Sequence, residues 1–278
     1  MGYGKNMKKI GLFFILIFFY ASTVLGAGDY AKVDSYAKRA PVLKNSSNLN
    51  HLVQYLVRPY ETDKEKARVL LAWIVYNIDY DGYKLNAIED KLKNTRKHNR
   101  QLFIPDNDIL ETRLGVCGDI AKLYQRMGEM AKLEVALIYG RVKHEDESAE
   151  AFELGPGHVW TAVKIDGQWE YVDPTFAMHG VGASVLGDVE RKREYQRIVK
   201  KRSKRSSSVK KARDGREVDD RWFLPDKDEM IKTHFPDDEK WQLQAQKLTK
   251  QEFLGLSDRE YKNMVKKDKK KRKKEVVR

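Results

Sequence analysis

Among its 278 residues the chain has a single cysteine, Cys117, so it cannot form a disulfide within itself. Zinc sites of the usual spacing are also excluded, because there is no second cysteine and no pair of histidines four residues apart. A glycine-rich loop of the phosphate-binding kind is missing as well. We therefore expect neither a metal nor a cofactor, and any chemistry must come from the chain's own side chains.

Long apolar runs are almost absent, and the exception extends from Ile10 to Leu25. It follows three lysines and precedes Gly26, an order typical of a signal peptide over residues 1–26. An uncleaved membrane anchor is the alternative, but about sixteen residues is short where roughly twenty are needed to cross a bilayer. We therefore predict a secreted or periplasmic protein. In an oxidising compartment, a lone thiol is either buried and inert or present for its chemistry.

The net charge of +13 is concentrated in two segments. Residues 191–216 contain thirteen basic and two acidic side chains, and residues 262–278 contain ten and two, which leaves the rest of the secreted chain acidic. Because runs of like charge stay solvated, we predict a disordered insertion at 190–217 and a disordered tail at 256–278. These segments are either solvated appendages or attachments to an anionic surface, such as membrane, cell-wall polymer or nucleic acid.

Helical patterns come first and strand patterns later, which predicts an α+β fold. After a helical segment at 27–60, a single domain is expected at 61–255. Thr62 and Glu65 form a capping box at the start of the first helix of this domain. The further expected elements are a helix at 118–133, strands at 135–142, 158–165 and 169–174, and a last strand at 222–224.

Cys117 lies in Gly115-Val116-Cys117-Gly118-Asp119, at the head of the predicted helix 118–133. A free thiol ionises with a pKa near ~8.5, but the unpaired N–H groups and the dipole of a helix N-terminus favour the thiolate. This position is typical of a nucleophile. The alternative is a small buried apolar residue, which is the usual role of a free cysteine.

His158 and Asp173 belong to a predicted hairpin whose turn is Asp166-Gly167. With a two-residue turn, Trp160 faces Asp173, so His158 lies on the same face as Asp173 and about 7–8 Å away along the diagonal. A carboxylate there can fix the tautomer of the imidazole and direct its other nitrogen toward a thiol. A three-residue turn would put Asp173 on the opposite face, and the residues would then be an edge histidine and a strand-ending aspartate.

The remaining histidines have no partner that the sequence can identify. His51, His98 and His144 lie in polar surroundings and are expected to be exposed. His179 and His234 could line a cleft, but a structural role is favoured for both because the sequence places no partner beside them.

Three segments resemble, in order and spacing, the core motifs of the transglutaminase-like superfamily: 115–119, 157–160 and 169–175. Two later segments, 223–226 and 233–238, resemble the C-terminal signature of its kyphoscoliosis-peptidase-like branch. The resemblance extends over about residues 60–245. It implies a papain-like α+β fold, in which helices pack on an antiparallel sheet and the nucleophile begins a helix.

The resemblance further implies that Cys117 is the nucleophile, His158 the general base and then acid, and Asp173 the residue that orients His158. The expected function is acyl transfer on a protein or peptide amide through a thioester, by a cysteine peptidase, a deamidase or a transglutaminase. We favour hydrolysis, because the branch is peptidase-like. The backbone N–H of Cys117 is expected to stabilise the oxyanion, and Tyr80 is a weaker second candidate. The alternative is an inactive scaffold that works through its basic segments.

Overall fold

The computed structural model of the protein describes residues 30–41, 48–82, 84–85, 106–143, 147–154, 157–178 and 216–266. The predicted signal peptide lies outside the described residues, as do most of the predicted basic insertion and the end of the tail. No helix in the described part of the chain has the length and apolar character needed to cross a membrane.

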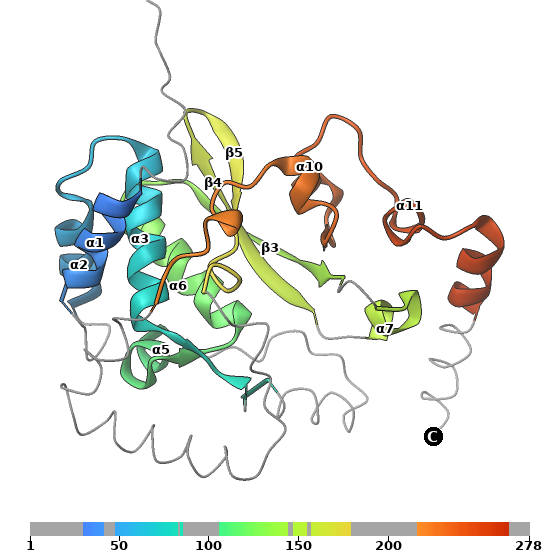
Figure 1. Ribbon diagram of the computed structural model, residues 1–278, viewed down its shortest axis with the longest axis horizontal. Coiled ribbons are helices and arrows are strands. Elements are labelled where there is room, and N and C mark those ends of the chain that lie inside the picture. Colours follow the sequence, from blue (N-terminus) through green and yellow to red (C-terminus); the bar gives the residue numbers. More distant parts are fainter. Residues whose placement is uncertain are drawn as a thin grey trace, which may run out of the picture.

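Five helices of the first half of the chain gather on one side of a central sheet (Figure 1). They are α1 (Ala31–Arg39), α2 (Leu49–Val57), α3 (Asp63–Asn77), α5 (Asp106–Thr112) and α6 (Cys117–Met130). The predicted cap at the start of α3 is confirmed, since the Thr62 hydroxyl accepts a hydrogen bond from the Glu65 N–H at 3.2 Å. Helix α3 is buried on nearly all sides because it lies among α1, α2 and α6.

The central sheet is antiparallel, with strand order β5-β4-β3-β6. Its strands are β3 (Val135–Val142), β4 (His158–Ile165), β5 (Gln168–Val172) and β6 (His234–Pro236). A separate parallel pair joins β1 (Asp79–Tyr80) to β2 (Leu114–Gly115), directly before α6. These helices and this antiparallel sheet confirm the predicted α+β class.

The β4–β5 hairpin has the predicted two-residue turn. Asp166 and Gly167 have φ values of 50° and 81°, the left-handed geometry that this turn requires, and Ile165 pairs with Gln168. Val163 and Ile165 therefore pack with the helices, while alternate residues of β4 face the opposite side of the sheet. This register determines where the ends of β4 and β5 project their side chains.

The chain after residue 216 covers the other face of the sheet (Figure 1). Its elements are η3 (Asp220–Trp222), α10 (Lys227–Met230), β6, η4 (Glu239–Gln242) and α11 (Lys250–Leu254), and α11 packs beside α7 (Ala149–Leu154). Met230 packs against Trp160 of β4, and the Tyr171 hydroxyl donates to the Trp241 carbonyl at 2.7 Å. The segment that follows the predicted insertion is thus part of the folded domain.

The predicted strand at 222–224 is wrong. The segment begins as η3, and within it only Phe223 forms a bridge, to Val172 of β5. Leu224 has a φ of 51°, a left-handed conformation that a strand cannot continue through. The last strand of the sheet is β6 instead.

Both segments predicted to be disordered include residues that are folded. Arg216 is folded, and its guanidinium donates to the carbonyls of Val75 and Ile78 at 3.0 and 2.8 Å. Residues 258–266 are helical, and the side chains of Ser257 and Glu260 cap this helix. Leu256 and Met264 pack beside α7 and α11, so apolar contact outweighs charge over this part of the tail.

Candidate active site

Cys117 is the first residue of α6 and follows β2 after one residue. The Asp119 carboxylate closes this turn, because it accepts from the Val116 N–H at 3.1 Å and pairs with Lys84 at 2.6 Å. Cys117 is a buried free cysteine that retains 9% of its surface. The predicted position of Cys117 at a helix N-terminus is confirmed.

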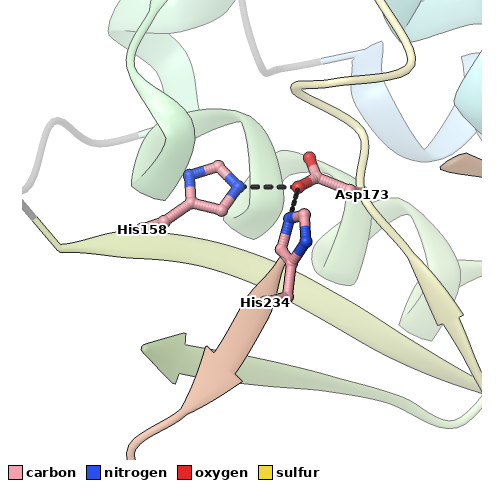
Figure 2. Close-up of side chains that lie close together, drawn as sticks. All are labelled: His158, Asp173 and His234. Carbon is pink, nitrogen blue, oxygen red and sulfur yellow. Dashed lines mark hydrogen bonds and ion pairs between the residues drawn. The ribbon is translucent and has the colours of Figure 1, made fainter. Parts of the chain in front are cut away.

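His158 begins β4, and Asp173 follows β5 on the neighbouring strand. The His158 Nε2 atom lies 2.6 Å from Asp173 Oδ2, and Figure 2 shows the two side chains pointing toward one another. The predicted diagonal contact across the hairpin is therefore present. Since Nε2 is engaged, Nδ1 is the ring nitrogen available to a thiol, and Cys117 is among the groups that raise the pKa of His158.

Asp173 has no exposed surface and accepts hydrogen bonds on both oxygens. Oδ1 accepts from the backbone N–H groups of Thr175 and Phe176, at 2.8 and 2.9 Å. Oδ2 faces His158 and, at 3.1 Å, His234. Burial alone would raise the pKa of Asp173, but the two histidines hold it well below its usual range. The surroundings of this buried carboxylate therefore favour its ionised form.

The surroundings of His158 favour the charged form of its imidazole. Burial acts to lower its pKa, but the Asp173 carboxylate, and to a smaller extent Cys117, raise the pKa of His158 to about 10. Trp160 stacks on the ring at 5.9 Å, and Phe176 meets it edge-on at 5.1 Å. An imidazolium beside a thiol favours the thiolate, which is the attacking form of cysteine.

His234 reaches the same site from β6, although the sequence predicted only a structural place for it. It is fully buried, its Nε2 atom faces Asp173 Oδ2, and its Nδ1 atom lies 2.8 Å from the Thr233 hydroxyl. No periodicity relates residue 234 to the β4–β5 hairpin. The sequence feature that points to His234 is the motif 233–238. It resembles the C-terminal signature of the branch, but the resemblance gives its histidine no role.

His158, Asp173 and His234 place three possible metal-ligand atoms within 4.8 Å of one another. A nitrogen and an oxygen that share a tetrahedral zinc ion at about 2.0–2.1 Å lie on the order of 3.3 Å apart. The 2.6 Å contact between His158 and Asp173 is shorter than that, and it fits a shared proton. We therefore interpret this cluster as a hydrogen-bond network.

The other residues considered in the sequence are Tyr80 and four histidines. Tyr80 of β1 pairs with Gly115, so it lies beside the turn that leads to Cys117, and it is half-buried. His51 is exposed on α2, as predicted. The three histidines 98, 144 and 179 lie outside the described residues.

The structure thus places a cysteine at a helix N-terminus, and a histidine and an aspartate joined across a hairpin. Residues 50–174 match the model of the transglutaminase-like superfamily, which supports the predicted superfamily. Its relatives include the kyphoscoliosis peptidases of Homo sapiens and Mus musculus. The predicted superfamily and branch are confirmed.

The human kyphoscoliosis peptidase is 27% identical over 223 residues, which are 80% of this chain and 28% of that protein. The mouse protein is 27% identical over 215 residues, 77% of this chain and 26% of its own length. This chain thus spans about a quarter of the length of these relatives. A crystal structure described as that of a TGase aligns with 58% of this chain and 36% of its own, at 15% identity and a TM-score of 0.34.

Proposed function

We propose that the protein is an exported, cysteine-dependent acyl-transfer enzyme that acts on amides of proteins or peptides. The observation that supports this most strongly is the His158–Asp173 hydrogen bond, together with Cys117 at the start of α6, since Asp173 and Cys117 both raise the pKa of His158. The names of the relatives, peptidase and TGase, describe the two outcomes of this one chemistry.

In the proposed first half-reaction, the Cys117 thiolate attacks the substrate carbonyl carbon. The backbone N–H of Cys117, which has no partner within the helix at this position, is suited to stabilise the oxyanion. His158 then gives its Nδ1 proton to the departing amine, the C–N bond breaks, and a thioester remains on the sulfur. Asp173 keeps the imidazole in the orientation that this transfer requires.

In the second half-reaction, neutral His158 removes a proton from the incoming nucleophile, which attacks the thioester and releases Cys117. Water as the nucleophile makes the protein a peptidase or deamidase, and an amine such as lysine makes it a transglutaminase. We favour water, because the relatives similar over most of this chain are named peptidases.

The choice of nucleophile is tested by offering both to one preparation. The wild-type protein is incubated with glutamine-containing and unmodified polypeptides, with and without a labelled primary amine, and products are identified by mass spectrometry. Cleavage or deamidation with no amine incorporation is the expected result, and Cys117→Ala is the matched control. Labelled amine in the product would favour transamidation, and no product of either kind would favour the scaffold alternative.

We also propose that the basic segment 191–215 attaches the protein to an anionic surface. The residues that bracket it lie together, since the Ala177 carbonyl accepts from the Asp219 N–H at 2.9 Å and Met178 bridges Val218. The chain therefore leaves and re-enters the domain at one point, so this segment can be removed without stretching the fold.

Deleting residues 191–215, while retaining the folded Arg216, is expected to leave the thermal unfolding midpoint unchanged. It should lower the salt concentration at which the protein elutes from an immobilised polyanion, because twelve basic side chains are lost. A variant with the same segment length and serine at those twelve positions separates charge from length. Unchanged elution would contradict the proposed attachment, and unfolding would mean that the segment is structural.

A further inference from the structure

Asp173 has a partner that lies outside the segment matched by the superfamily model. That match ends at residue 174, yet His234, sixty-one residues beyond Asp173, donates into the same carboxylate (Figure 2). We propose that His234 is a positioning residue of the active site, which holds Asp173 so that Asp173 can orient His158. This inference rests on the proposed function, because it assigns a role within the same network.

The geometry at Asp173 explains why a second histidine matters. Oδ1 is fixed by the two N–H groups of Thr175 and Phe176, but one fixed oxygen leaves the carboxylate free to swing about that anchor. His234 contacts the other oxygen, Oδ2, at 3.1 Å, beside the 2.6 Å contact of His158. With both oxygens held, the plane of the carboxylate is set before His158 engages it.

His234 is suited to positioning and not to reacting. Its side chain has no exposed surface, so it cannot touch a substrate. A carboxylate only accepts hydrogen bonds, so Nε2 of His234 must carry the proton that faces Asp173. In the neutral ring Nδ1 is then an acceptor, and the Thr233 hydroxyl, 2.8 Å away, is placed to donate to it. Both ring nitrogens thus have a partner that fixes the tautomer.

The strand that holds His234 is itself tightly placed. Strand β6 pairs with β3 where Gly140 faces Pro236, and a Cβ atom on Gly140 would lie 2.3 Å from the Phe235 carbonyl oxygen. This close approach is open only to glycine. The rings of Trp160 and Trp222 pack on His234 at 5.1 and 5.3 Å. The imidazole is therefore fixed by its strand and by its neighbours.

Three substitutions of His234 in the full-length protein test this role. His234→Gln places an amide N–H at the ε position, where it can still reach Asp173, whereas His234→Asn places it at the shorter δ position and His234→Leu has no donor. The readout is the rate at which iodoacetamide alkylates Cys117 at pH 6, which needs no substrate, together with the thermal unfolding midpoint. At that pH an ordinary thiol, with a pKa near ~8.5, reacts slowly.

We expect the Asn and Leu variants to be alkylated about tenfold more slowly than wild type, the factor that loss of one hydrogen bond to a charged group predicts. The Gln variant should stay within about threefold of wild type, since it restores the donor. If His234 had a purely structural role, the alkylation rates of the three variants would instead follow their thermal unfolding midpoints. If the Asn and Leu variants do not fold, the Gln variant alone decides. An alkylation rate near that of wild type supports the positioning role of His234, and a tenfold lower rate or a failure to fold overturns it.

The same measurement separates this inference from the proposed function. If wild-type Cys117 reacts at pH 6 no faster than an ordinary thiol, the Cys117–His158 pair itself is wrong. If wild type reacts fast and His234→Leu matches it while folded, only the role of His234 is wrong.

Discussion

Cys117→Ala is expected to abolish turnover of any substrate that the wild-type protein accepts, by about 10⁴-fold or more. The thioester forms on this sulfur, and no second thiol is present to replace it. The variant should remain folded, because alanine fits wherever cysteine does and removes only the sulfur atom from this buried residue. Initial rates measured on the substrates identified above, with circular dichroism as the check on folding, provide the measurement.

Because the chain has one cysteine, iodoacetamide reports on Cys117 without any background substitution. We expect labelling of wild type well below pH ~8.5, where ordinary thiols ionise, and no labelling of Cys117→Ala. Cys117→Ser is the closer steric control, and it should also be inactive, since a hydroxyl is not ionised by a neighbouring imidazolium. Labelling that rises only at pH ~8.5 would contradict an activated thiol and favour the scaffold. Activity retained in Cys117→Ala would contradict Cys117 as the nucleophile.

The parts of the site that follow from local chemistry were predictable from the sequence. Asp166-Gly167 is a turn dipeptide, and a two-residue turn fixes the register of the hairpin. With that register, alternation of side chains is enough to bring His158 toward Asp173. The start of α6 at Cys117 was likewise indicated by the glycine turn before it and the amphipathic pattern after it.

His234 was not predictable in this way, because its place depends on tertiary packing. A three-residue edge strand such as β6 is too short to show alternation, and its proline reads as a turn. Its contact with Asp173 requires the close approach of β6 to β3 at Gly140, which neither segment specifies alone. The charge patterns failed for a related reason, since Arg216 and residues 256–266 find partners in the folded domain that composition does not reveal.

Asp173→Asn is the second substitution with a large expected effect, a loss of about 10³-fold in kcat/KM. The carboxylate of Asp173 receives four N–H groups, two on each oxygen, but an amide has only one acceptor oxygen. The backbone donors of Thr175 and Phe176 cannot turn away, so the oxygen of the asparagine should face them. Its NH₂ then faces His158 Nε2, which forces the ring proton onto Nδ1 and removes the base.

The matched control is Glu170→Gln, the same carboxylate-to-amide change on β5, at a residue that pairs with Lys227 at 3.0 Å outside the site. It should leave kcat/KM unchanged. Both rates are measured on the substrate of the wild-type protein, with thermal unfolding as the check on folding. Activity of Asp173→Asn within about tenfold of wild type would mean that His158 does not depend on the charge of Asp173.

The same variant should reveal the ion pair through the pH dependence of stability. The lowered pKa of Asp173 stabilises the fold above the ordinary value of 3.8, and that stability is lost as pH falls below it. The raised pKa of His158 stabilises the fold fully below 6.5, and that stability is lost as pH rises to about 10. The free energy of unfolding of wild type should therefore exceed that of Asp173→Asn most between about pH 4 and 6.5, and the difference should shrink toward pH 10. Urea unfolding of both proteins at pH 5, 7 and 9 measures this difference in the free energy of unfolding. A difference that grew with pH would contradict a charged His158–Asp173 pair.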